Sequence, residues 1–228
     1  MGRLVIGLVA AAALVHACGS DPFDDASWRQ EFDLAGCDLM ATGRNEFFVL
    51  EPGFQLVLEG GNEKVAITVL DETRTITGLE TRVVEEREWI SGNLIEVSRN
   101  FFAICPATGD VFYFGEEVDD FKDGEIVGHS GAWVAGEGGA RAGLIMPGDP
   151  TPGMRYYQEI APDAALDRAE VIGIDETLIT PAGTFTGALK TEETSGLKSE
   201  RGFKTYAPGI GLIQDERLLL IEWGFRSE

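Results

Sequence analysis

The first candidates for catalytic chemistry in this chain are His129 and the many carboxylates. Only two histidines occur, and the other, His16, lies in a segment that we expect to be removed. A Ser-His-Asp triad would therefore have to use His129, whose neighbour Ser130 should point to the opposite face of a strand. The 39 Asp and Glu residues offer many pairs suited to glycoside hydrolysis, but so many pairs single out none. We predict no specific catalytic residue, and we expect His129 to be a half-exposed strand residue.

The acidic run from Glu116 to Glu125 is the best candidate for a metal site. A calcium loop needs oxygen ligands at alternating positions and a closing glutamate. Phe121 occupies one ligand position of that template, and Ser130 stands where the closing glutamate should be. The single remaining histidine also excludes multi-histidine zinc or copper sites. We predict a solvated hairpin tip here, with a calcium site outside the EF-hand pattern as the alternative, and neither a metal nor a cofactor elsewhere.

The thiol of Cys18 stands at the end of a predicted export signal. Arg3 precedes an unbroken apolar run over residues 4–14, which is too short to span a bilayer. Ala17 and Cys18 then resemble a bacterial lipobox, in which the cysteine is acylated and becomes the mature N-terminus. We therefore expect a signal peptide at residues 1–17 and membrane attachment through a lipid on Cys18. Secretion after cleavage near Ala17, or an uncleaved anchor, is the alternative.

The expected localisation is the cell envelope. Gly19, rather than aspartate, follows the cysteine, as in lipoproteins that are sorted to the outer membrane. If the cell has such a membrane, we expect the protein to face the periplasm from it. That compartment is oxidising, so Cys37 and Cys105 are expected to form a disulfide rather than remain as two separate buried thiols.

The net charge of −21 restricts the partners of this chain. An anionic surface of that size repels nucleic acid and anionic lipid headgroups. The apolar content of 44% is ordinary for a folded domain. We expect a solvated domain with no nucleic-acid partner, and specific cation binding is the alternative explanation of the charge.

From residue 47 onward the sequence alternates as β-strands do. Runs rich in β-branched and aromatic residues are separated by turn signals at residues 60–62, 91–93 and 122–125. This pattern predicts a mainly β fold, an antiparallel meander curled into an open or closed barrel, as a single domain over residues 47–228. The only helical candidate lies near residues 162–169.

Two segments depart from this pattern. Residues 18–46 are expected to hold the lipidated cysteine, a tether and an irregular segment, from which Trp28, Phe32 and Leu34 dock onto the domain. The stretch 136–153 contains six glycines and three prolines, which predicts a loop. Its apolar centre favours a docked loop or flap over a free domain linker.

A faint internal repeat is also present. Asp71-Glu72-Thr73 and Asp175-Glu176-Thr177 each end a strand just before a hairpin, 104 residues apart. Two similar half-units curling into one sheet would explain the repeat, and coincidence in an acidic, β-rich chain is the alternative.

Three motifs resemble those of a widespread group of uncharacterised bacterial envelope proteins, often lipoproteins, built on curved antiparallel sheets. They are residues 110–116 (DVFYFGE), 181–185 (PAGTF) and 206–213 (YAPGIGLI). A more distant similarity is to the Lol-type lipoprotein carriers and related mycobacterial lipid-binding lipoproteins, in which an open β-barrel holds acyl chains. The similarity is architectural, so it implies a fold and assigns no site residue.

Aromatic side chains are the remaining candidates for a binding site. Neighbouring aromatics on one strand point to opposite faces, so some could line a cavity inside a curved sheet. Ordinary core packing is the alternative explanation. The residues that we predict to contact a ligand are Trp89, Phe112, Phe114, Trp133, Met146 and Tyr157.

These observations support three functional hypotheses. The first is a non-enzymatic extracytoplasmic lipoprotein that binds a lipid or another apolar or amphipathic ligand within the curved sheet, with residues 136–153 as a flap over a continuous apolar interior. The second is a structural or protein-interaction envelope lipoprotein with a solid core. The third is a carboxylate-based hydrolase, which predicts an acidic cleft with perturbed carboxyl pKa values.

Overall fold

The structure is a computed structural model that describes residues 27–199 and 201–226. The predicted signal peptide, residues 1–17, and the predicted lipidation site, Cys18, lie outside these residues. No helix in the described ranges is long and apolar enough to cross a membrane. The regular structure is antiparallel β-sheet, so the predicted fold class is confirmed.

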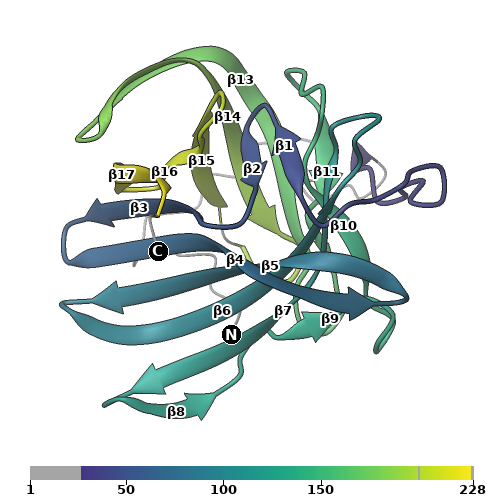
Figure 1. Cartoon of the computed structure of the whole chain (residues 1–228), viewed down its shortest axis with the longest axis horizontal. Helices are drawn as coiled ribbons and strands as arrows, with labels where there is room; N and C mark the ends of the chain where they lie inside the picture. The colour runs from purple at the N-terminus through teal and green to yellow at the C-terminus, as the bar shows by residue number, and fades with distance from the viewer. Residues whose placement is uncertain (1–26, 200, 227–228) are drawn as a thin grey trace, which may run out of the picture.

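The main sheet is a barrel in which strands pair with their neighbours in chain order. Strand β17 pairs back with β3 and joins the last strand to the first. Figure 1 shows β3 to β7 following one another across one side of the molecule, with β13 and β14 on the opposite side. The wall consists of β3 (Phe54–Gly60), β4 (Glu63–Ile76), β5 (Leu79–Ile90), β6 (Asn93–Ile104), β7 (Val111–Lys122), β10 (Arg141–Met146), β13 (Asp167–Thr180), β14 (Gly183–Ser195), β15 (Arg201–Ala207), β16 (Gly211–Asp215) and β17 (Leu218–Phe225).

The gap between β10 and β13 is closed by one short stretch, residues 155–160, which we call the seam. Its first part, β11 (Arg155–Tyr157), pairs with β13, and its last part, β12 (Glu159–Ile160), pairs with β10. Between them, the backbone N–H of Gln158 donates to the carbonyl oxygen of Asp167 over 2.8 Å. A Cβ at Gly143 would lie 2.2 Å from the carbonyl oxygen of Gln158, so only glycine lets β10 approach this closely. The seam therefore makes the barrel nearly closed.

Tight turns join the long strands. The pairs Thr77-Gly78, Ser91-Gly92 and Asp123-Gly124 have positive φ at both positions, as two-residue type I′ turns require. The turn signals at 91–93 and 122–125 thus form hairpins as predicted. Two short strands, β8 (Glu125–Gly128) and β9 (Trp133–Val134), pair with β7 outside the main path.

Two predictions about secondary structure were wrong. The stretch 136–153 is no simple loop, because it contains the wall strand β10 with Leu144 and Met146 buried. Its glycines and prolines form the turns at either end, and Gly143 serves the close contact with the seam. The helical candidate near 162–169 is instead a turn, closed by reciprocal hydrogen bonds between Ala161 and Ala165, followed by the start of β13.

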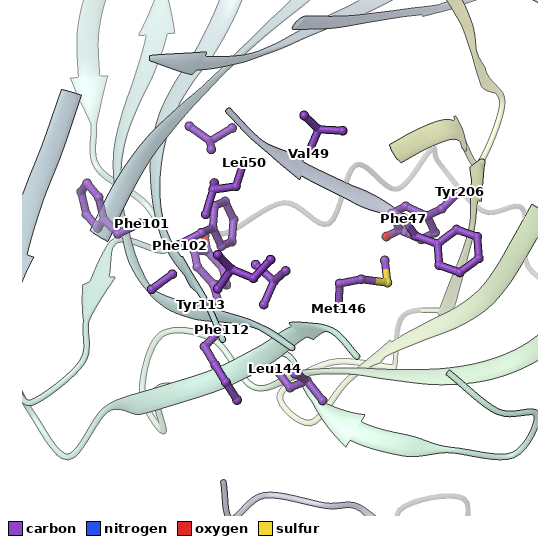
Figure 2. Packing of buried hydrophobic residues seen from close by; sticks show 14 of the residues in the cluster. Phe47, Val49, Leu50, Phe101, Phe102, Phe112, Tyr113, Leu144, Met146 and Tyr206 are labelled. Carbon is purple, nitrogen blue, oxygen red and sulfur yellow. The ribbon is translucent and has the colours of Figure 1, made fainter. Parts of the chain in front are cut away.

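One end of the barrel is blocked by the hairpin of β1 (Gly43–Asn45) and β2 (Phe48–Leu50), which we call the plug. Its Asn45 amide donates to the carbonyl oxygens of Gly109 and Pro147, and the carbonyl of Glu46 accepts from Gly209. These partners lie in loops at the same end of the wall. In Figure 2 the apolar side chains of the plug lie between side chains of the opposing walls, and they belong to one buried cluster.

The segment before the plug is fastened to the outside of the barrel. Trp28 and Phe32 make edge-to-face contacts with Tyr157 and Phe112, at centroid distances of 6.5 and 5.9 Å. Leu34 packs against the main core, so the predicted docking of all three is confirmed. The predicted disulfide between Cys37 and Cys105 is also present, and it ties this segment to the end of β6.

The two Asp-Glu-Thr segments occupy similar places in the fold. The register of β4 on β5 shifts between Val69 and Thr73, and that of β13 on β14 shifts between Gly173 and Glu176. Both segments are therefore β-bulges, which bend a long hairpin and increase its twist. The repeated sequence corresponds to a repeated irregularity in the wall.

We expect the combined substitution Cys37→Ser and Cys105→Ser to lower the free energy of unfolding. The cysteines are 68 residues apart, and closing a loop of that length contributes about 4 kcal/mol in the chain-entropy model. Urea unfolding of both proteins measures the difference. A reducing agent should lower the stability of the parent protein only, and equal stability of parent and variant would contradict the prediction.

Candidate functional site

The interior of the barrel contains a cavity of about 210 Å³. It extends from Phe48 and Val49 of the plug to Leu197 and Lys198, which lie in the turn after β14 at the other end of the wall. An apolar cavity of about 150 Å³ is large enough to hold benzene. The space is therefore sufficient for a small organic molecule.

The part of the cavity next to the plug is apolar. Strand alternation turns Phe54 and Leu56 of β3 inward, opposite Ile67 and Val69 of β4. Ile210, in the turn after β15, and Leu212, on β16, complete this wall. The apolar end is thus built from four neighbouring elements and the plug.

The rest of the cavity is lined mainly by carboxyl groups. On β5 to β7, the inward positions form cross-strand pairs, Glu86 with Ser98, Glu88 with Glu96, and Asn100 with Glu116. The seam, β13 and β16 add three more acids. The carboxylic acids that line the cavity are Glu86, Glu88, Glu96, Glu116, Glu159, Asp167 and Asp215.

Lys204 is the basic residue at the centre of this polar region. Its Nζ lies 2.9 Å from Oε2 of Glu193 and 4.0 Å from Oδ2 of Asp215. Burial acts to lower the pKa of Lys204, but the charges of Glu193 and Asp215 outweigh it and raise that pKa above its usual value. The other oxygen of Glu193, a residue only 1% exposed, accepts hydrogen bonds from Gln158 at 3.0 Å and Tyr206 at 3.4 Å. Lys204 is therefore neutralised by the wall itself.

The carboxyl groups of the cavity hold their protons tightly. Burial raises the pKa of Glu86 to about 7 and that of Glu116 to about 8, and in both cases the charge of Glu96 adds to the effect. Burial also raises the pKa of Asp215 to about 7. For Glu159, burial and the neighbouring charges of Asp167 and Glu116 raise the pKa well above its usual range. Glu86, Glu116 and Asp215 therefore change charge near neutral pH instead of near pH 4.

Two hydrogen bonds fix the polar wall. The hydroxyl of Tyr113 donates to the side-chain oxygen of Asn100. The indole N–H of Trp133 donates to Oε2 of Glu159 over 3.1 Å. Tyr113 and Asn100 both line the cavity, whereas Trp133 holds Glu159 from behind the lining.

None of the six residues predicted to contact a ligand is among those that line the cavity. Phe112 and Phe114 point to the face of β7 opposite Tyr113, and both are buried. Trp133 comes nearest, because its ring meets Tyr113 edge-on at 5.3 Å. It supports the wall from behind rather than facing the interior.

The other three predicted residues lie in different surroundings. Met146 is buried in the main core. Tyr157 packs against Trp28 on the outside of the seam. Trp89 is half-buried on β5, opposite Leu94. Whether any of the six affects binding remains a prediction.

The residues that do line the polar end were missed by sequence reasoning. Their signal is an alternation of polar side chains, such as Glu86 and Glu88 on one strand and Glu96 and Ser98 on the next. Alternation alone does not say which face is inside, because Glu85 and Arg87 give the other face of β5 the same polar character.

The acidic run from Glu116 to Glu125 lies partly at the cavity and partly on the exposed surface. Residues 122–125 form an exposed tip as predicted, but Glu116 faces the cavity, which corrects that part of the prediction. His129 follows β8 and is exposed, with Nδ1 3.0 Å from Asp119, so the prediction of a half-exposed strand residue was wrong. Within residues 27–199 and 201–226, no group of three or more His, Cys, Asp or Glu is arranged to hold a metal ion.

Comparison with known proteins gives little direct guidance. No family model and no curated protein matches the chain. A crystal structure of a provisionally assigned lipoprotein from Parabacteroides distasonis aligns with 80% of this chain and 100% of that one, at 14% identity and a TM-score of 0.38. What the cavity holds must therefore be inferred from its own residues.

We expect the protein to lose stability as the pH rises from about 5 to about 8. The carboxyl pKa values of Glu86 and Glu116 are higher in the folded protein than the usual value of 4.5, so the folded state binds more protons than the unfolded chain across this range. A melting temperature lower by at least about 4 °C at the higher pH is expected for a chain of this size.

The double variant Glu86→Gln and Glu116→Gln separates this effect from general charge repulsion. It should flatten the dependence of melting temperature on pH, because two titrating groups are removed. The exposed substitution Glu80→Gln is the matched control and should leave the slope unchanged. An identical slope in all three proteins would rule out titration of the interior carboxyls as its cause.

Proposed function

We propose that this protein is a non-enzymatic lipoprotein of the cell envelope that binds a small amphipathic molecule inside its barrel. The observation that supports this proposal best is the lining of the interior cavity, which is apolar next to the plug and mainly acidic towards the other end. A ligand whose own polarity changes along its length matches such a lining at both ends.

The unfilled interior argues against a purely structural role. An empty apolar cavity costs a protein about 24 cal/mol for each Å³, so side chains that filled the barrel would give a more stable fold. The carboxyl groups of the cavity add a further cost, because desolvation disfavours their charged forms. An interior that is both unfilled and acidic is better explained by binding than by a scaffold.

Attachment to the envelope rests on the sequence. Residues 1–17 have the order of an export signal, and Cys18 follows a small residue as in lipidated proteins. The Cys37–Cys105 disulfide agrees with an oxidising compartment. We further propose that the protein faces the periplasm from the outer membrane, if the cell has one.

A carboxylate-based hydrolase is the second candidate. The raised carboxyl pKa of Glu116, about 8, is the property that a general acid requires. A panel of chromogenic glycosides tests this alternative. Hydrolysis that is lost in Glu116→Gln would replace the binding proposal with an enzymatic one.

We expect the full chain, expressed in a bacterial host, to incorporate radiolabelled palmitate at Cys18. The variant Cys18→Ser should remain unlabelled, because it keeps the export signal but lacks the thiol. Gel autoradiography of membrane fractions measures both. Label on the variant, or none on the parent, would contradict lipid attachment at this residue.

We expect the Cys18→Ser protein, purified gently from the periplasm, to carry a bound small molecule. Native mass spectrometry before and after organic extraction should show a mass excess that extraction removes. The substitution Ile67→Phe fills the apolar end and should abolish the excess. The matched substitution Val97→Phe, on the outward face of β6, should retain it. A bare chain mass in the parent protein would count against a tightly held ligand.

A further inference from the structure

We infer that the molecule bound in the cavity is a cationic amphiphile, with a protonated amine among the carboxylates and an apolar body against the plug end. This inference rests on the proposed function, because it specifies the chemical class of the same ligand. Three features of the interior support this ligand class. Acids outnumber lysines, the lysines already interact with acids of the wall, and the acids lie beyond an apolar end.

The charge balance favours a cation. The acids that line the cavity come from six strands, whereas the lysines come from one strand and one turn. The titratable groups around the cavity are Glu86 and Glu88 on β5, Glu96 on β6, Tyr113 and Glu116 on β7, Tyr156 on β11, Glu159 on β12, Asp167 on β13, Glu193 on β14, Lys198 in the following turn, Lys204 and Tyr206 on β15, and Asp215 on β16.

The lysines are not available to an anionic ligand. Lys204 contacts both Glu193 and Asp215, so a bound anion would have to displace these carboxylates. Burial raises the pKa of Asp167 to about 6, and the charge of Lys198 partly opposes this shift, so Lys198 already acts on an acid of the wall. A carboxylate or phosphate headgroup would meet repulsion from each remaining acid that is ionised.

The arrangement of the acids suits an organic cation better than a metal ion. In the described part of the chain, no three acidic or histidine side chains converge as metal ligands do. An ammonium group carries three donors that can reach separate acceptors. The apolar wall of Phe54, Leu56 and Ile67 then gives the ligand's body a surface that a hydrated metal ion would not use.

Tyr156 does not contribute to the site. Its hydroxyl is fully buried and has no hydrogen-bond partner in the structure, but Tyr156 is not among the residues that line the cavity. The class of ligand is therefore inferred from the lining residues.

Binding of a cation is coupled to proton release. The carboxyls of Glu86, Glu116 and Asp215 are largely protonated below neutral pH, and only their ionised forms attract an ammonium group. An alkyl amine itself keeps its proton up to about pH 10. The affinity for an amine should therefore increase between about pH 6 and about pH 8.5.

The test compares three probes of equal chain length, octylamine, octan-1-ol and octanoate, by calorimetric titration of the Cys18→Ser protein. Titrations at about 0.15 M salt limit binding to the acidic outer surface. We expect octylamine to bind at least about tenfold more tightly than octan-1-ol, and octanoate to bind least. Raising the pH should strengthen only the amine.

Two variants test whether octylamine binds at the cavity or on the outer surface. Glu116→Gln should weaken octylamine binding about tenfold, the loss expected when one partner of a charge-assisted contact is removed, with no change for octan-1-ol. Glu80→Gln, on the exposed surface, should change neither and serves as the matched control. Equal weakening by both substitutions would assign the binding to the surface and overturn the inference.

The outcomes separate this inference from the proposed function. Selective binding of octylamine, lost in Glu116→Gln, supports both. Equal binding of all three probes, or preference for octanoate, leaves a ligand-binding barrel but overturns the cationic ligand. If none of the probes binds and no mass excess is found in the purified protein, both proposals fail.

Discussion

Backbone hydrogen bonding around a nearly closed wall determines where every strand side chain of this protein points. Once β17 has paired with β3 and the seam has joined β10 to β13, alternate residues have only the interior to face. The register that sets Glu86 against Ser98 and Asn100 against Glu116 then brings acids together that are far apart in the chain. Their raised pKa values follow from this confinement.

The plug makes the two ends of the interior chemically different. By covering one end, the β1–β2 hairpin removes Phe47 and Leu50 from water and allows the adjoining wall to be apolar. The Cys37–Cys105 disulfide and the contacts of Asn45 hold it there. Away from the plug, the lining consists mainly of carboxyl groups. One hairpin thus divides a uniform architecture into two chemically different halves.

Local signals in the sequence were sufficient for the fold but not for the site. Turn residues such as Ser91-Gly92 and the cysteine pair specify hairpins and a crosslink through their own chemistry, and the structure contains them. Strand β10 escaped prediction because the need for Gly143 arises only when the seam lies beside it. The acids of the cavity escaped for a related reason, since both faces of β5 carry charges and only the closed wall decides which face is inside. Three of the aromatic residues that we predicted to contact a ligand, Phe112, Phe114 and Trp133, lie in the packed core instead.

The seam has a consequence for the kinetics of exchange between the interior and solvent. Three residue pairs hold β11 to β13 and two hold β12 to β10, whereas ten join β13 to β14. Local opening requires the least free energy where the fewest hydrogen bonds must break together. The seam and the two-pair contact between β16 and β17 are therefore the parts of the wall whose amide protons we expect to exchange first, and whose separation would admit solvent to the interior.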